Sequence, residues 1–416
     1  MNVQSFDAIV IGAGPAGSAA ATVLAEYGRR VALLEKSRFP RYRVGESLIP
    51  FCWHPLNRLG LVEAMDEAAF KVFKQSVQFV SQEGQLSKPF YFDEHTDHPC
   101  ARTWQVVRSD FDRLVRGNAV AKGAELFEET TAREFLREEG KVVGVRCDSP
   151  EGELELRAPV TIDASGREAM AQQKNQWRVP DEQLKKMAVW TYYQGALRDE
   201  GKDEGATTIA YIPGKGWFWY IPLPDDMVSV GVVADKEYLF AETKDPETIF
   251  EREVKRQPWI ERHLEPGRCT GEFHVTSDFS NRSQYCAEDG LVLAGDAFAF
   301  LDPVFSSGVF LALQGGVMAA DAVEEALRAG DTSAERFQGY GERFCAGMEA
   351  MRKLVYAFYE ENFNFAEFLK DHPQYQHALT DCLIGNLWRN FDEFFAEMSN
   401  YMLVPEPLPH GHQVAG

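Results

Sequence analysis

The stretch FDAIVIGAGPAG, residues 6–17, decides the fold class of this chain. Residues 6–11 form an apolar run that predicts a short buried strand, and residues 18–27 predict an alanine-rich helix that Gly28 would cap. Residues 30–34 predict a second strand, which ends at Glu35, eighteen residues after Gly17. This order of elements indicates a Rossmann-type dinucleotide-binding unit rather than a chance glycine-rich turn: a strand, a glycine-rich turn, a helix, and a second strand that ends in an acidic residue.

Each residue type in this unit has a physical reason. Gly12 permits the tight turn, Gly14 lets the backbone approach a pyrophosphate, and Gly17 allows the helix to pack closely on the strand. The N-terminus of the helix stabilises phosphate charge. Glu35 would accept hydrogen bonds from the ribose hydroxyls of the adenosine and would repel a 2′-phosphate. The nucleotide is therefore expected to be FAD or NAD, not NADP.

Composition excludes several classes of partner. The chain has 416 residues, enough for two or three domains, and a net charge of 43 − 64 = −21, which disfavours nucleic acid and anionic membranes. No run approaches the length of a membrane span, and the strand pattern at residue 6 leaves no room for a secretory signal. The seven cysteines are scattered and contain no CxxC pair, so reduced thiols, a cytoplasmic location and no metal site are expected.

Three later segments favour FAD: RSDFD at 108–112, DASGR at 163–167 and LVLAGDA at 291–297. Together with the N-terminal unit they resemble the FAD-binding domain of the para-hydroxybenzoate-hydroxylase-like family over residues 6 to about 370. That family includes aromatic hydroxylases, geranylgeranyl reductases and halogenases. The resemblance implies that Asp296 binds ribityl or pyrophosphate oxygens, that Gln105 and Arg108 lie along the FAD, and that Gly166 approaches the pyrophosphate. For Asp296 alone, an aspartate at the end of a strand in a turn is the simpler alternative.

The expected fold is therefore α/β: a Rossmann-type FAD-binding domain, an antiparallel-sheet substrate domain and a C-terminal helical region. The FAD-binding domain is expected to be discontinuous and to comprise residues 1–75, 105–175 and 285–335. Residues 76–104 and 176–284 would form the sheet, residues 336–402 the helical region, and residues 403–416 a disordered tail in which His410 and His412 are solvated.

The run WFWYIP, residues 217–222, predicts a strand with aromatic side chains on both faces. Trp217 and Trp219 would lie on one face, Phe218 and Tyr220 on the other, and Pro222 would end the ladder pairing. A core strand explains such a run by itself. Within a flavoprotein, however, the run resembles the W-x-W-x-I-P signature of flavin-dependent halogenases, which implies that Trp217 and Trp219 line the passage between flavin and substrate.

Two segments near the N-terminus resemble the halogenase and geranylgeranyl-reductase branch. GESLIP at 45–50 resembles a loop near the isoalloxazine, which makes Glu46 a candidate catalytic acid, although Glu46 could instead cap the following helix. Residues 61–73 show helical periodicity, so Lys74 is expected at a helix-to-strand junction. KQSVQF at 74–79 resembles the stretch that carries the halogenating lysine. The alternatives are that Lys74 is a surface lysine at a helix end, or that Lys71 has the catalytic role.

The segment DPVFSSGV at 302–309 resembles the family's halide-binding turn, which implies that the backbone N–H groups near Ser307 and Gly308 hold halide. The same N–H groups would stabilise reduced flavin in a reductase. Tryptophan-type halogenases have a glutamate where this chain has Phe305, so tryptophan is not expected as the substrate. The phenol- and pyrrole-type branch often has histidine where this chain has Phe310.

These resemblances imply a halogenase-like enzyme that uses reduced FAD, O₂ and halide to halogenate an electron-rich phenol or pyrrole through hypohalous acid held by Lys74. No second glycine-rich strand–turn–helix unit is evident for a nicotinamide, so a separate flavin reductase is expected to supply reduced FAD. A carrier protein that holds the substrate is left open. A monooxygenase or geranylgeranyl-reductase-like enzyme without halide chemistry is the main alternative, and a flavin-binding module without activity is the third.

Overall fold

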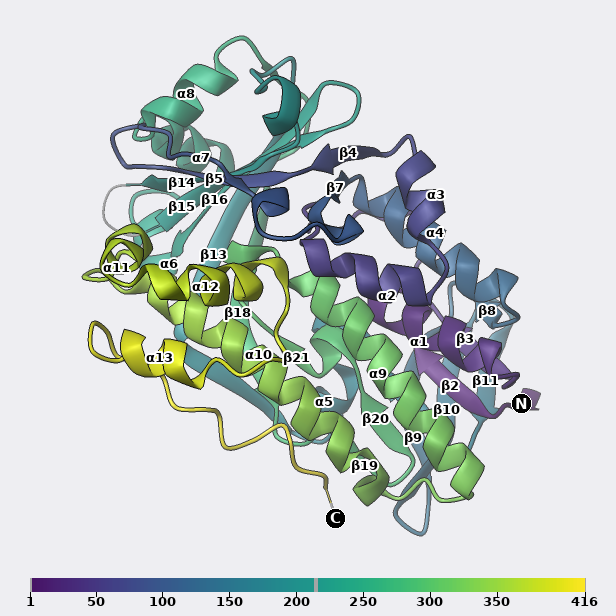
Figure 1. The fold of residues 1–416 in the computed structure, drawn as a ribbon. Helices are drawn as coiled ribbons and strands as arrows, with labels where there is room; N and C mark the ends of the chain where they lie inside the picture. The colour runs from purple at the N-terminus through teal and green to yellow at the C-terminus, as the bar shows by residue number, and fades with distance from the viewer. Residues whose placement is uncertain (1, 213–215, 416) are drawn as a thin grey trace.

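The structure is a computed structural model that describes residues 2–212 and 216–415. Its elements form a mixed α/β fold in which one mainly parallel sheet lies next to a large, mainly antiparallel sheet, with long helices along one side (Figure 1). The predicted fold class is confirmed at this level.

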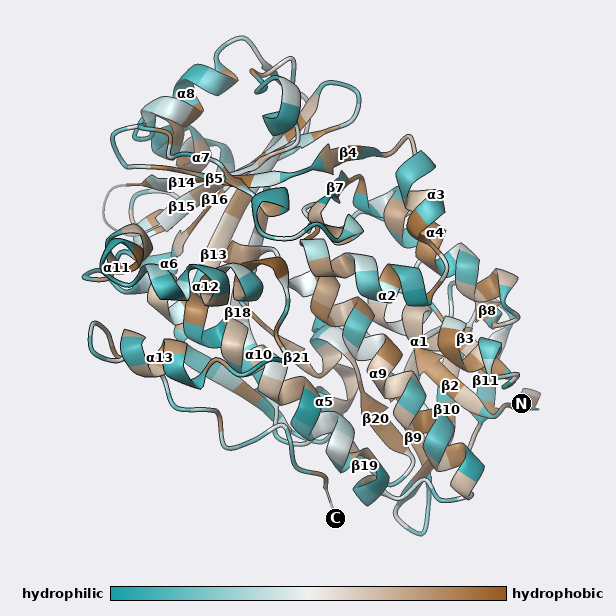
Figure 2. Ribbon diagram, viewed as in Figure 1, coloured by the Kyte–Doolittle hydropathy of each residue, from teal (hydrophilic) through white to brown (hydrophobic). Residues whose placement is uncertain are grey.

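The first sheet has the strand order β19-β20-β12-β2-β3-β8. Its members are β19 (Ala287–Glu288), β20 (Leu291–Leu293), β12 (Thr161–Asp163), β2 (Ala8–Ile11), β3 (Val31–Leu34) and β8 (Glu125–Phe127). All pairs except β19·β20 are parallel, and every residue of β2, β3, β12 and β20 is buried. Figure 2 shows these central strands as hydrophobic, which is typical of a parallel sheet covered on both faces.

The crossover between β2 and β3 is helix α1 (Pro15–Glu26). The helix begins at Pro15 rather than at the expected Ser18, because the fixed φ of proline suits the first helical position. Gly28 follows the last turn with φ +81°, the left-handed conformation expected of a residue that ends a helix. Helix α4 (Arg108–Ala121) and helix α9 (Gly308–Ala329) both pack against α1, which brings residues far apart in the sequence to the glycine-rich turn.

The second sheet has the order β21-β18-β13-β16-β15-β14-β5-β6, with β17 paired to β13. Its members are β21 (Ala299–Phe300), β18 (His274–Ser283), β13 (Arg178–Gln194), β16 (Met227–Asp235), β15 (Gly216–Leu223), β14 (Thr207–Ile212), β5 (Ser76–Val80), β6 (Phe90–Tyr91) and β17 (Arg268–Cys269). The short helices α6 (Lys236–Leu239), α7 (Pro246–Val254) and α8 (Pro258–Leu264) accompany this sheet (Figure 1).

The aromatic strand is β15, and its two faces belong to two different hydrophobic clusters. Trp217 and Trp219 pack into the large core, whereas Phe218 and Tyr220 pack into the cluster that contains α7 and α8, as the alternation predicts. The expectation that Pro222 ends the pairing is wrong, because Pro222 still pairs with Val228 of β16. On the other side, β14 pairs with β15 only as far as Tyr220, so no partner needs an N–H group from the proline.

The expected helix over residues 61–73 is also wrong. Helix α3 covers only Val62–Glu67, and residues 71–74 form strand β4 (Lys71–Lys74), which pairs with β7 (Thr103–Val106). Ala68 leaves the helix with extended backbone angles, and pairing with β7 then overrides the helical spacing of the apolar residues. Helix α2 (Trp53–Arg58) lies between the Gly45–Pro50 loop and α3.

A four-stranded sheet flanks the parallel sheet in the order β1-β11-β10-β9. Its members are β1 (Asn2–Ser5), β11 (Gly152–Arg157), β10 (Lys141–Ser149) and β9 (Thr131–Glu138). Helix α5 (Met170–Lys174) follows β12. The domain boundaries proposed above remain predictions.

The C-terminal part continues from α9 with α10 (Gln338–Tyr359), α11 (Phe365–Asp371), α12 (Gln376–Ile384) and α13 (Asp392–Met398). Residues 403–415 are not the expected disordered segment, and residue 416 lies outside the described residues. Val414 bridges to Ala287 in parallel, and the N–H of Cys286 donates to the carbonyl of Gln413 at 2.9 Å. His410 is 8% exposed instead of solvated. This segment extends the edge of the parallel sheet, and a backbone that pairs with an edge strand needs no periodicity of its own.

Within the described residues, no helix is both long and apolar enough to cross a membrane. All seven cysteines are free thiols, and only Cys269 is exposed.

Candidate active site

The glycine-rich turn is shaped by close backbone packing. Gly12 has φ +98°, and a Cβ atom on it would lie 2.4 Å from the carbonyl oxygen of Ala164. A Cβ atom on Gly17 would lie 1.8 Å from the carbonyl oxygen of Gly12. At Gly14 the nearest atom is 3.4 Å away and belongs to the Arg41 side chain. The turn is therefore closed toward the protein but leaves the backbone of Gly14 approachable, as a bound pyrophosphate requires.

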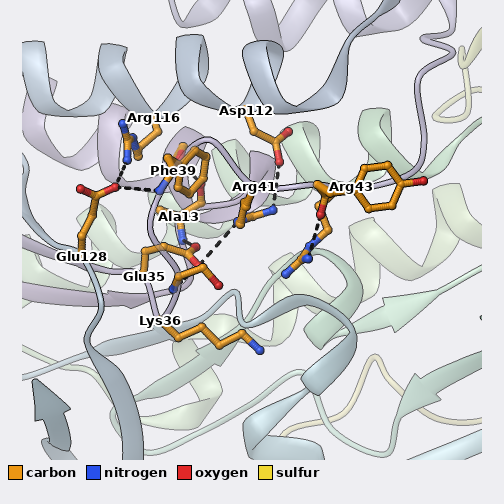
Figure 3. Close-up of polar contacts among 12 residues, drawn as sticks. Ala13, Glu35, Lys36, Phe39, Arg41, Arg43, Asp112, Arg116 and Glu128 are labelled. Atoms are coloured by element: carbon orange, nitrogen blue, oxygen red, sulfur yellow. Dashed lines mark hydrogen bonds and ion pairs between the residues drawn. The ribbon is translucent and has the colours of Figure 1, made fainter. Parts of the chain in front are cut away.

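Glu35 lies beside this turn, where Figure 3 shows its carboxylate between backbone N–H groups and an arginine. Its two oxygens accept hydrogen bonds from the N–H of Ala13 at 3.2 Å and from the N–H of Ser37 at 3.0 Å. The Arg41 guanidinium lies 3.5 Å from Glu35 and 3.3 Å from Asp112 (Figure 3). Glu35 is thus fixed at the position where it could receive ribose hydroxyls.

Arg41 is a residue that sequence reasoning missed. It is nearly buried, and it places a cation next to the glycine-rich turn. The signal in the sequence was the basic run KSRFPRYR at 36–43, directly after Glu35. A cation at this place would balance the charge of a pyrophosphate.

The loops after β12 and β20 meet at the same end of the sheet. Gly166, with φ +68°, lies in the turn after β12, and no atom lies within 4 Å of the position of its Cβ. Asp296 is half-buried in the turn after β20, where Gly295 packs against Ala16 of α1. These two turns contact each other, so the structure brings Gly166 and Asp296 close to the glycine-rich turn.

Arg108 and Gln105 hold loops together. The Arg108 guanidinium donates to the carbonyls of Val44 at 2.7 Å and Gly45 at 3.1 Å, and it pairs with Asp112. The buried Gln105 side chain donates to the carbonyl of Gly205 at 2.9 Å and to the Thr207 hydroxyl at 2.8 Å. Arg108 therefore fixes the start of the Gly45–Pro50 loop, and Gln105 holds Gly205 and Thr207 in place.

Lys74 is buried, with 1% of its surface exposed, which excludes the surface-lysine alternative. Its amine donates to the Ser47 hydroxyl at 2.8 Å, and Ser47 in turn lies 2.8 Å from the Thr207 hydroxyl. Among the described residues no carboxylate pairs with this amine, so burial lowers the pKa of Lys74 from 10.5 to about 7. At pH 8 most of this amine is neutral and has a free lone pair. Lys71 differs, because it is only partly buried and its amine stacks 4.1 Å from the centre of the Phe73 ring.

Lys74 lies in the wall of a cavity of about 900 Å³. Aromatic and aliphatic side chains dominate the lining, and they include Phe79, Tyr211, Trp217, Phe305, Phe358 and Tyr359. A cavity of this size and character suits a multi-ring or otherwise extended apolar ligand. Trp217 lines the cavity, whereas Trp219 lies behind it, 6.2 Å from Trp217 between ring centres.

The turn at 302–308 forms another part of the cavity wall through Val304, Phe305 and Ser306. Ser306 has φ +55°, and Ser307 precedes the first turn of α9, which begins at Gly308. The Ser307 hydroxyl is buried without a hydrogen-bond partner among the described residues, and no atom lies within 4 Å of a Cβ placed on Gly308. A left-handed residue before a 22-residue helix turns N–H groups toward one point, where an anion can bind.

A hydrogen-bonded chain that the sequence did not reveal connects this turn to the aromatic strand. The Trp217 indole donates to the Tyr359 hydroxyl at 2.9 Å, and Tyr359 donates to Asp302 at 3.0 Å. Asp302 also accepts from the N–H of Val304 at 3.0 Å. The chain fixes Trp217 relative to the 302–308 turn, although its partners are 142 residues apart in one hydrogen bond and 57 in the other.

Glu46 is buried and caps no helix. It accepts a hydrogen bond from the Tyr192 hydroxyl at 2.6 Å, and Tyr192 lies 2.9 Å from the hydroxyl of the partly exposed Tyr42. Burial raises the pKa of Glu46, and the hydrogen bonds from Tyr192 and Ser229 oppose this effect. Ser229 also accepts from the Trp219 indole at 3.1 Å, so the Gly45–Pro50 loop and the aromatic strand share one polar network.

The comparisons with known proteins agree with this geometry. The family model described as tryptophan halogenase matches residues 7–104 and 89–406. The chain belongs to this family of flavin-dependent halogenases.

Two relatives and one solved structure illustrate the relationship. A 1H-pyrrole-2-carbonyl-(peptidyl-carrier protein) brominase of Pseudoalteromonas luteoviolacea is 33% identical over 359 residues, 86% of each protein. A 1H-pyrrole-2-carbonyl-(peptidyl-carrier protein) chlorinase of Pseudomonas fluorescens is 28% identical over 93% of this chain and 91% of its own length. The structure of the flavin-dependent brominase Bmp2 superposes with a TM-score of 0.86 at 28% identity, covering 96% of this chain and 99% of that chain.

The protein is thus a flavin-dependent enzyme of the halogenase class with a Rossmann FAD-binding fold. The residues present fit the cofactor. The approachable Gly14 backbone, the fixed Glu35 and the adjacent Arg41 suit an adenine dinucleotide, and the open space at Gly166 and Gly308 leaves room along its length.

Proposed function

We propose that this halogenase transfers halogen from Lys74 to the electron-rich ring of a phenol or pyrrole that occupies the 900 Å³ cavity. The observation that carries the proposal is the Lys74 amine: it is buried, its pKa is lowered to about 7, and it lies in the cavity wall. A free amine is the form that can hold hypohalous acid or accept halogen.

Bound FAD, once reduced, supplies the activation of O₂ that oxidises halide to hypohalous acid. The protein residues provide binding and orientation. The glycine-rich turn, Glu35 and Arg41 would bind the dinucleotide, and Asp296 would bind the ribityl or pyrophosphate oxygens, since it lies in the turn that packs on α1. The N–H groups at Ser307 and Gly308 would hold the halide.

The lone pair of Lys74 would attack the halogen of hypohalous acid; the oxygen–halogen bond breaks, and hydroxide leaves as water with one amine proton. Ser47 accepts one N–H of the amine, which leaves its lone pair able to face the cavity. Trp217, fixed by Tyr359, and Phe305 would separate the substrate ring from the flavin so that only the halogen passes. Glu46 is placed to give or take a proton near the Gly45–Pro50 loop, with Tyr192 and Tyr42 leading from it toward the surface.

Phe305 supports a phenol or pyrrole rather than tryptophan. A phenyl ring stands where the tryptophan-type enzymes have a catalytic glutamate, and it packs edge to face on Phe358 in the cavity. The phenyl ring of Phe305 cannot pair with the ammonium of a free amino acid as a glutamate at that position could.

A separate flavin reductase would supply reduced FAD, and halide and O₂ would be co-substrates. The two relatives described above act on pyrrole bound to a peptidyl-carrier protein, which makes a carrier-bound aromatic ring a substrate to test beside free phenols and pyrroles.

The test uses the full chain with FAD, a flavin reductase with NADH, O₂ and either chloride or bromide. Free phenols, free pyrroles, tryptophan and carrier-bound pyrrole are offered separately, and products are identified by mass spectrometry. We expect the wild type and Lys71→Ala to form halogenated phenol or pyrrole, and Lys74→Ala to form none. Halogenated tryptophan as the main product would overturn the proposed substrate class.

The reductase or monooxygenase alternative predicts a different result. Such an enzyme would oxidise NADH or NADPH directly, without the separate reductase and without any effect of halide. A chain that purifies without flavin would instead support the third alternative, a module without activity.

A further inference from the structure

Two histidines and one cysteine converge outside the cavity, where none of them has a role in halogenation. They are His54 on α2, and His98 and Cys100 at the short 3-10 helix Pro99–Ala101. One ligand atom from each lies within 4.8 Å of the other two. His98 and Cys100 are two positions apart, whereas His54 lies 44 positions before His98, so the fold brings His54 to the other two residues.

The ligand atoms are available. Within residues 2–212 and 216–415, the ring nitrogens of His54 and the thiol of Cys100 form no hydrogen bond. His98 uses only Nδ1, which accepts from the N–H of Cys100 at 3.1 Å. Because Nδ1 accepts this hydrogen bond, the neutral ring carries its proton on Nε2, and zinc would take the place of the Cys100 N–H at the Nδ1 lone pair. The two imidazoles lie face to face with ring centres 5.2 Å apart, and the Trp53 ring packs on the edge of both.

We propose that His54, His98 and Cys100 form a zinc site, with water as the fourth ligand. Imidazole nitrogen and thiolate sulfur are the ligands that Zn²⁺ prefers, whereas Mg²⁺ and Ca²⁺ prefer oxygen. Around a tetrahedral zinc, such atoms stand roughly 3.4–3.6 Å apart, given bond lengths of about 2.0–2.3 Å. Both histidines are exposed, so side-chain rotation can close the difference, and the proton of the Cys100 thiol passes to solvent when zinc binds.

The position of the site gives it a structural purpose. Helix α2 follows the Gly45–Pro50 loop, which carries Glu46 and Ser47, and the 3-10 helix at 99–101 directly precedes β7, which carries Gln105. Zinc would therefore clamp together the segment that carries Ser47, the hydrogen-bond partner of Lys74, and the segment that carries Gln105. The site does not rest on the proposed halogenation, because zinc would bind whether or not the chain transfers halogen.

The test uses full-length, tag-free protein with bound FAD, treated with a chelator and dialysed. Zn²⁺ binding is measured by calorimetry and metal analysis, and Co²⁺ is added alone as a spectroscopic probe. We expect one Zn²⁺ per chain, a near-ultraviolet thiolate-to-cobalt band, and a melting temperature about 2 °C or more higher with zinc. His54→Ala and His98→Ala should lose stoichiometric binding, and Cys100→Ser should lose the thiolate band.

Two variants serve as matched controls. His377→Ala removes a histidine from the separate His95–His377 pair, whose rings lie 5.0 Å apart, and Cys269→Ser removes the exposed thiol. Both should bind zinc like the wild type. The proposal would be overturned if the wild type bound no stoichiometric zinc. It would also be overturned if folded His54→Ala, in which only an exposed side chain is changed, bound zinc like the wild type.

Discussion

Replacement of Lys74 by methionine should make the protein more stable, and by an amount that depends on pH. An unfolded lysine keeps its proton up to about pH 10.4, whereas burial lowers the pKa of folded Lys74 to about 7. Between these values the unfolded state binds one more proton, so the free energy of unfolding of the wild type rises with pH. Below pH 7 both states hold the proton, and the folded protein bears the full cost of a buried charge.

The difference between a pKa of 10.5 and one of about 7 corresponds to about 5 kcal/mol. That cost applies at pH 6, falls to about 2 kcal/mol at pH 9 and vanishes above about pH 10.5. Lys74→Met removes this cost but also removes the hydrogen bond to Ser47, which is worth about 1 kcal/mol. The gain in stability over the wild type should therefore be a few kcal/mol at pH 6 and close to 1 kcal/mol at pH 9.

The assay is urea unfolding followed by tryptophan fluorescence at pH 6 and pH 9, with Lys71→Met as the control. Lys71 is only partly buried, so its replacement should change stability less and with a weaker dependence on pH. In parallel, kcat for halogenation should rise with pH through about 7 in the wild type, as the amine loses its proton. Lys74→Arg should be inactive at every pH, because a guanidinium keeps its proton. An equal stability change for Lys74→Met at both pH values would refute the assignment of a neutral, buried amine.

Three further predictions concern other parts of the site. Gly12→Ala should abolish FAD binding, measured by flavin fluorescence, because the Cβ of the new alanine would lie 2.4 Å from a backbone oxygen. The control Gly117→Ala, at an open position of α4, should bind FAD normally. Tyr192→Phe removes the 2.6 Å hydrogen bond to Glu46, so the pKa of Glu46 should rise further, and the protein should lose about 1.5–3 kcal/mol of stability at pH values above that pKa. A pH profile of kcat identical to that of the wild type would exclude a role of Glu46 in proton transfer. Trp217→Phe breaks the link to Tyr359, and product analysis should show less halogenated product per NADH consumed; unchanged coupling would mean that Trp217 is only a core residue.

The sequence predicted those parts of the fold that depend on local spacing. The glycine-rich turn, the flanking strands and Gly28 follow from backbone conformations that few residues other than glycine adopt. The two faces of β15 follow from the alternation of side chains along a strand. Local rules failed where a distant partner decided the structure: β4 is a strand because β7 pairs with it, and residues 411–415 are ordered against the edge of the parallel sheet.

In the candidate site too, the sequence predicted the residues that belong to short motifs but not the contacts they make with distant parts of the chain. Glu46, Lys74 and the turn at 302–308 could be named from short motifs, but their environment could not. Burial of Lys74 depends on Ser47 and Thr207, and the Trp217–Tyr359–Asp302 chain joins three separate elements. Arg41 was missed because its role depends on the packing of α4 and its Asp112 against the loop after β3.

The central claim is that Lys74 carries the active halogen. Protein is first reacted with reduced FAD, O₂ and bromide in the absence of substrate, then desalted to remove flavin, bromide and free hypobromous acid, and finally mixed with an activated phenol. The account predicts that the wild type and Lys71→Ala form bromophenol in amounts up to one equivalent, and that Lys74→Ala forms none. Bromophenol from desalted Lys74→Ala in the same amount as from the wild type would contradict the account.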